Sequence, residues 1–76
     1  MKIHRNFFTR SLKITDNYLT VLASKSGISL KDQKFITFDQ LESICKFLEI
    51  ESRDYRKLAL KTRIDNFMTA QRLNNE

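Results

Sequence analysis

The sequence predicts a mainly α-helical, compact domain of three to four helices that includes all of residues 1–76. The chain contains no proline and a single glycine, and tight β-turns depend on those two residues. Its hydrophobic fraction of 41% and charged fraction of 30% are typical of a globular domain rather than a disordered tail. A chain of 76 residues buries a modest share of its surface, so we expect a partner or a second copy to add stability.

Residues 1–14 are expected to form either a basic N-terminal helix or a flexible arm. Apolar residues four positions apart, Ile3 with Phe7 and Phe8 with Leu12, favour a short helix. The same segment carries four basic residues and no acidic one, which suits an arm that contacts a polyanion. Both alternatives remain open from the sequence.

A second helix is expected to begin at Thr15 or Asp16, because either side chain can accept from the free N–H groups of a first turn. Its apolar stripe is Tyr18, Leu19, Leu22 and Ala23. Gly27 is placed to end this helix in a left-handed conformation, with Ile28 making the accompanying apolar contact. A short β-strand is expected at residues 35–37.

The start of the third helix has the clearest signal in the chain. Thr37 and Gln40 form a capping box, and Ile36 and Leu41 can form the hydrophobic staple around it. The helix should therefore begin at Phe38. Its expected buried stripe is Leu41, Ile44, Cys45 and Leu48.

A long last helix is expected over residues 53–73, with Ser52 as its cap. One apolar stripe consists of Tyr55, Leu58, Ala59 and Thr62, and the other of Leu60, Ile64, Phe67 and Met68. A helix with two apolar faces usually packs on two surfaces. We therefore predict a homodimer whose interface is formed by Leu60, Ile64, Phe67 and Met68, with Phe7 and Phe8 nearby.

Residues 41–60 resemble the helix-turn-helix motif of DNA-binding regulators. The motif has apolar residues at its fourth, eighth, tenth, fifteenth and eighteenth places, which here are Ile44, Leu48, Ile50, Tyr55 and Leu58. Cys45 provides the small fifth residue, whereas Glu49 stands where glycine is usual. The resemblance implies a helix-turn-helix over residues 38–63 whose second helix faces the major groove. A helix and a short strand before such a motif are similar to the start of winged-helix domains, here without a wing hairpin at the end.

The charge distribution agrees with this resemblance. The net charge is +5, and residues 52–66 carry five basic and two acidic residues. The resemblance implies an outward DNA-binding face made of Ser52, Arg53, Arg56, Lys57, Leu60, Lys61 and Arg63. Arginine can contact guanine with two hydrogen bonds, and lysine and serine suit phosphates. Lys2, Arg5 and Arg10 of the N-terminal segment are expected to reach further phosphates.

The sequence gives no sign of catalysis, so we do not expect an enzyme. His4 is the single histidine, Cys45 is the single cysteine, and neither has partners spaced for a metal site or a nucleophile. No cofactor motif and no apolar run long enough for a membrane span are present, and the cytoplasm is the expected location.

The function predicted is that of a small dimeric transcriptional regulator that binds double-stranded DNA. The alternative is a small protein-binding modulator, such as an inhibitor, antitoxin or adaptor, that acts through helix-mediated contacts. A third possibility, an RNA-associated protein, lacks an aromatic RNA-binding signature.

Overall fold

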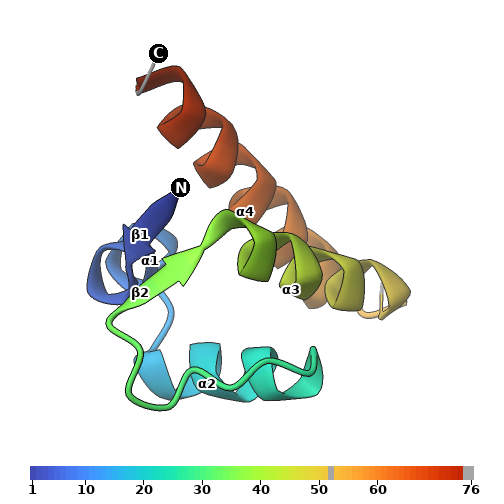
Figure 1. The fold of residues 1–76 in the computed structure, drawn as a ribbon. Helices are drawn as coiled ribbons and strands as arrows, with labels where there is room; N and C mark the ends of the chain where they lie inside the picture. Colours follow the sequence, from blue (N-terminus) through green and yellow to red (C-terminus); the bar gives the residue numbers. More distant parts are fainter. Residues whose placement is uncertain (52, 75–76) are drawn as a thin grey trace.

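The computed structural model describes residues 1–51 and 53–74 (Figure 1). This part of the chain forms a mainly α-helical domain with four helices and one small antiparallel sheet, as the sequence predicts. The elements in order are β1 (Lys2–His4), α1 (Arg5–Leu12), α2 (Asp16–Lys25), β2 (Phe35–Thr37), α3 (Phe38–Ile50) and α4 (Tyr55–Asn74). The α3–α4 pair forms the most extensive contact between elements, and α2 lies across the other side of α3 (Figure 1).

The N-terminal segment is a strand followed by a helix, so the flexible-arm alternative is wrong. Strand β1 pairs with β2 in antiparallel register, with Ile3 opposite Ile36, and both side chains are buried. The backbone N–H of Arg5 continues the ladder by donating to the carbonyl of Lys34 at 3.0 Å. Because β1 has three residues and a partner more than thirty positions away, its sequence has no local signal that would have predicted it.

The connections after α1 and α2 end their helices with left-handed residues. Lys13 has a φ of 56°, and the next N–H, that of Ile14, donates to the carbonyl of Thr9 at 3.0 Å. Gly27 has a φ of 80°, and the N–H of Ile28 donates to Ala23 at 2.8 Å. The predicted glycine stop is thus confirmed, while at the end of α1 a lysine occupies a conformation that favours glycine.

The predicted start of α3 is confirmed. The hydroxyl of Thr37 accepts from the backbone N–H of Gln40 at 3.1 Å, and the backbone N–H of Thr37 donates to the side-chain oxygen of Gln40 at 3.0 Å. At the start of α2, Thr15 is the cap, since its hydroxyl accepts from the N–H of Tyr18 at 3.0 Å. The expected stripe of α3 is buried, namely Leu41, Ile44, Cys45 and Leu48.

Helix α4 begins two residues later than predicted. Ser52, the expected cap, lies outside the described residues. The carboxylate of Asp54 accepts from the N–H of Arg56 at 2.9 Å, and its carbonyl accepts from the N–H of Leu58 at 3.1 Å. Asp54 therefore caps the helix, and Arg53 lies in the turn before it.

The core receives the apolar stripe of α4 that was assigned to a dimer interface. The buried residues are Leu60, Ile64, Phe67 and Met68. The ring of Phe67 meets the fully buried ring of Phe8 edge-on, with centroids 5.3 Å apart. These four side chains and Phe8 pack within the single chain and are not available to a second copy. The predicted dimer interface is therefore wrong for these five residues. Phe7, half exposed and 5.8 Å from the ring of Phe67, stays accessible.

The other stripe of α4 faces solvent, which corrects the burial expected from the helix-turn-helix resemblance. Ile44 and Leu48 are fully buried as predicted, but Ile50 and Tyr55 are each 81% exposed and Leu58 is 43% exposed. Tyr55 and Leu58 are exposed because α4 turns its other apolar stripe toward the core, and Ile50 is exposed because it lies on the side of α3 opposite to the buried stripe. The spacing of residues 41–60 matches the motif, while three of its five apolar places do not pack as the motif requires.

Candidate nucleic-acid interface

The residues predicted to contact DNA lie in different environments. Leu60 is buried in the core, so its assignment to an outward face is wrong. Arg53 and Arg56 are exposed at the start of α4. The remaining cations of the set form ion pairs within the chain, lie along one flank of α4 or, in the case of Arg10 and Lys2, lie in the last turn of α1 and in β1. Their surroundings decide what each can bind.

Arg5 holds the fold together, which makes its assignment to phosphates wrong. Its Nε and Nη2 donate to the two carboxylate oxygens of Asp16 at 2.8 and 3.0 Å, and Nη2 also donates to the hydroxyl of Thr20 at 3.0 Å. Its Nη1 donates to the carbonyls of Leu30 and Gln33 at 2.7 and 2.9 Å. All five N–H donors of a guanidinium are thus used, and the side chain is only 15% exposed.

The flank of α4 that faces α3 is electrically balanced. Three of its cations form ion pairs: Lys57 with Glu51 at 3.7 Å, Lys61 with Asp65 at 2.7 Å and Arg72 with Glu42 at 3.0 Å. The hydrogen bond from Lys61 to Asp65 raises the pKa of the Lys61 ammonium. Because neighbouring carboxylates offset these charges, this flank attracts a polyanion weakly.

The flank of α4 that faces α1 carries cations that no carboxylate offsets. Arg56 and Arg63 are seven residues apart, which places them on one side of the helix about 10 Å apart. Arg63 donates to the carbonyl of Leu12 at the end of α1, so the last turn of α1 adjoins this flank. The basic strip, as we call it, consists of Arg10, Lys13, Arg56 and Arg63, all exposed and without an ion pair in the described chain.

Between the two flanks α4 presents an exposed outer face without charge. This outer face consists of Tyr55, Leu58, Ala59, Thr62, Asn66, Thr69, Ala70 and Leu73. It runs the length of the helix, about 27 Å. The hydroxyls of Thr62 and Thr69 donate to carbonyls of the preceding turn, whereas the amide of Asn66 makes no hydrogen bond within residues 1–51 and 53–74.

The chain matches no family model, no curated protein and no solved structure. The candidate interface is therefore assigned from the geometry of this chain alone. None of the helices in the described part of the chain has the length and hydropathy needed to cross a membrane.

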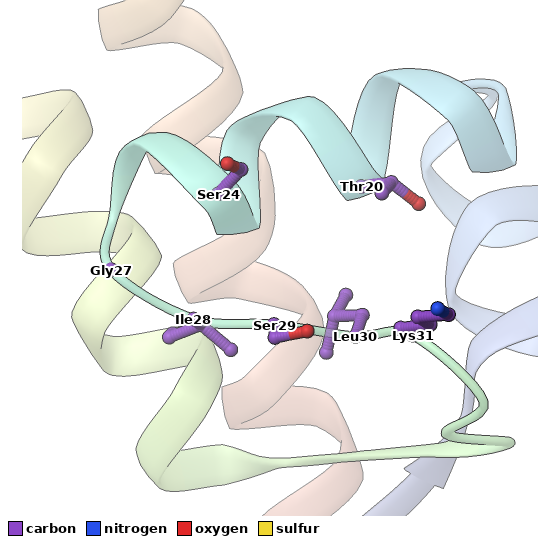
Figure 2. Close-up of a pocket in the computed structure, with 7 residues that line it drawn as sticks. All are labelled: Thr20, Ser24, Gly27, Ile28, Ser29, Leu30 and Lys31. Carbon is purple, nitrogen blue, oxygen red and sulfur yellow. The ribbon is translucent and has the colours of Figure 1, made fainter.

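The groove in Figure 2 lies apart from α4. It has a volume of about 360 Å³ and lies between α2 and the extended segment 27–31, with Thr20 and Ser24 on the helix side. Of the residues that the structure describes, Lys31 is the one charged residue in its lining, and none of them contributes a carboxylate or an imidazole. Among the described residues that were predicted from the sequence to contact DNA or a second copy, none lines this groove.

Sequence reasoning did not select Lys13, Thr62 or Asn66 as binding residues. The seven-residue spacing of Arg56 and Arg63 was a usable signal for a common flank. The direction in which that flank faces depends on which apolar stripe of α4 enters the core. Thr62 and Asn66 become candidates only after that choice is known.

Proposed function

We propose that this protein binds duplex DNA through α4, with the outer face of the helix in the major groove and the basic strip on the adjoining phosphates. The observation that carries this proposal is an exposed, uncharged helix face bordered by Arg56 and Arg63, neither of which has a carboxylate partner in the part of the chain described. A major groove about 12 Å wide admits a helix about 10–12 Å in diameter.

The side chains of the outer face suit the chemistry of base edges. The amide of Asn66 can both donate to and accept from adenine, and Ala59 can contact the methyl group of thymine. Arg56 and Arg63 lie at the border of the face, where the phosphates of a groove wall would lie. The basic strip therefore supplies affinity, while the outer face supplies any preference for sequence.

The imbalance between the two flanks favours one orientation on the duplex. On the flank that faces α3, the cations Arg72 and Lys57 are paired with Glu42 of α3 and with Glu51, the cap residue at its end. The basic strip has surplus positive charge. We expect the duplex to lie closer to α1 than to α3, so that the end of α1 contacts the phosphates of the strand that Arg56 and Arg63 contact.

Binding to a random pool of duplexes and to the duplexes enriched from it tests the proposal. Arg56→Ala should weaken binding to all duplexes and reduce the slope of log K against log salt by about 0.9, as expected for one lost phosphate contact. Asn66→Ala should leave that slope unchanged and reduce the preference for the enriched sequence by about 1–3 kcal/mol. Lys31→Ala, an exposed lysine away from α4, is the matched control.

Three results would contradict the proposal. These are a wild-type protein that does not bind duplex DNA at low salt, an Arg56→Glu variant that binds as well as wild type, and a Lys31→Ala variant that loses as much affinity as Arg56→Ala. Circular dichroism should show unchanged helix content in each variant, because all three side chains are exposed.

A further inference from the structure

A second open groove lies where α2 and α3 end, at the same side of the molecule in Figure 1. It has a volume of about 340 Å³ and is lined by Lys25, Ser26, Ser43, Lys46, Phe47 and Ile50. No residue of the basic strip or of the outer face of α4 lines it. The groove is thus separate from the surface proposed to bind DNA.

The apolar part of this groove is unusually exposed. Ile50 is 81% exposed although it ends a helix whose other aliphatic side chains are buried. Phe47 packs partly against the core, and the ammonium of Lys57 lies 5.8 Å from the centre of its ring. An aromatic and an aliphatic side chain at the surface of one groove can take up an apolar side chain from a partner.

The polar groups of the groove define the charge of its occupant. The hydroxyls of Ser26 and Ser43 donate to carbonyls of their own helices, those of Leu22 and Asp39, at 2.8 and 3.2 Å. The ammonium groups of Lys25 and Lys46 form no ion pair with any residue the structure describes, and no carboxylate lines the groove. Two uncompensated positive charges thus flank an apolar surface.

We propose that this groove docks an acidic amphipathic segment of a partner protein, with an apolar side chain against Phe47 and Ile50 and carboxylates on Lys25 and Lys46. Charge complementarity selects such a segment over a basic or neutral one. The apolar surface selects a peptide over a nucleic acid, because a phosphate backbone would leave Phe47 and Ile50 uncovered. The site does not depend on DNA binding by α4.

The test uses the full chain and a fluorescein-labelled helical peptide, with leucine and phenylalanine on one face and glutamate on the other. Its control peptide has the same apolar face and lysine in place of glutamate. Fluorescence polarisation should show that the acidic peptide binds and the control peptide does not. The largest changes in amide NMR chemical shift on binding should occur at Lys46, Phe47 and Ile50. Ile50→Ser and the double variant Lys25→Glu, Lys46→Glu should each weaken binding about tenfold or more.

A matched control separates loss of the groove from a general change in net charge. The double variant Lys31→Glu, Lys34→Glu changes the net charge equally at two exposed lysines outside the groove and should leave peptide affinity within about twofold of wild type. Failure of the acidic peptide to bind, equal binding of the two peptides or equal weakening by both double variants would overturn the proposal. The same holds if duplex DNA, rather than the peptide, shifts the groove residues. DNA binding measured on the Ile50→Ser variant reports separately on α4 and should be unchanged.

Discussion

At the residue scale, Leu48 and Ile50 show that the position of a side chain around a helix decides its burial. Both occupy apolar places of the helix-turn-helix pattern, yet Leu48 is fully buried and Ile50 is 81% exposed. The difference arises because two residues along an α-helix are about 200° apart, so Ile50 lies on the side of α3 opposite to the buried stripe that includes Leu48. The two positions therefore form an internal comparison within one helix.

Leu48→Ala should lower the free energy of unfolding by about 2–5 kcal/mol, because it leaves a cavity in a close-packed core. Ile50→Ala should change it by less than about 0.5 kcal/mol, as exposed substitutions usually do. Urea denaturation of both variants beside the wild type measures the difference. Equal destabilisation by the two substitutions would contradict the packing described for α3.

Cys45 should make the stability of the fold sensitive to alkaline pH. Burial, followed by the nearby carboxylate of Asp65, raises the pKa of its thiol from 9.0 to about 12. In the unfolded chain the thiol ionises near pH 9, and in the folded chain it stays protonated, so ionisation favours unfolding. The stability is complete below pH 9 and falls as the pH rises toward 12.

The Cys45→Ala variant isolates this contribution, since lysines and tyrosines titrate in the same range. The difference in unfolding free energy between wild type and Cys45→Ala should shrink steadily from pH 8 to pH 11, as measured by urea denaturation at each pH. A difference that stays constant over this range would show that the thiol ionises equally in both states. Thiol-reactive reagents should label native Cys45 slowly at pH 8 for the same reason.

At the scale of elements, the helix ends show which parts of the fold a sequence can predict. The starts of α2 and α3 and the glycine stop after α2 were predicted correctly because each depends on side chains within a few residues of the end. Strand β1 was not predicted, because its pairing depends on residues 35–37. The rotation of α4 was predicted wrongly, because two apolar stripes compete and the choice depends on Phe8 and other residues far along the chain.

The same distinction applies to the candidate interface. The surplus of basic residues on the last helix was visible in the sequence. The sequence did not show which of these cations are free to bind a partner. Arg5 uses its donors on Asp16 and two carbonyls, and Lys61 pairs with Asp65. Ion pairing and burial are tertiary properties, so spacing alone overestimates the binding surface.

The capping box of α3 gives a prediction at this scale. Thr37→Ala removes the acceptor for the N–H of Gln40 and should cost about 1 kcal/mol of unfolding free energy, whereas Thr37→Ser keeps the hydroxyl and should cost little. Thermal unfolding followed by circular dichroism compares the two variants. A Thr37→Ala protein that melts like wild type would show that the cap contributes nothing measurable.

At the scale of the whole molecule, segments distant in sequence contact each other at two places. Strand β1 pairs with β2, and α1 contacts α4 through the rings of Phe8 and Phe67 and through the bond from Arg63 to the carbonyl of Leu12. Both contacts involve the first twelve residues. We therefore expect the N-terminal segment to unfold together with the helices. Homodimerisation stays a prediction, and of the interface residues first assigned to it only Phe7 remains accessible.

Ile3→Asp tests whether the N-terminal segment unfolds with the rest. Placing a carboxylate opposite the buried Ile36 should lower the melting temperature of the entire domain, monitored at the α-helical signal. Lys2→Asp, an exposed neighbour in the same strand, is the matched control and should leave the melting temperature nearly unchanged. If Ile3→Asp frays only the first residues, as followed by hydrogen exchange, the domain is stable without β1.

The left-handed Lys13 after α1 should affect the stability of the domain and the proposed DNA binding in opposite directions. With a φ of 56°, Lys13 occupies a conformation that costs an ordinary residue about 1–2 kcal/mol, so Lys13→Gly should stabilise the domain by about 1 kcal/mol. The same substitution removes a positive charge from the basic strip and should weaken duplex binding through one phosphate contact. Lys13→Gln, which removes the charge but keeps the cost of the left-handed backbone, separates the two effects, since it should weaken duplex binding without stabilising the domain. If Lys13 contacts a phosphate, the residue that lowers the stability of the domain is also one that raises its affinity for DNA.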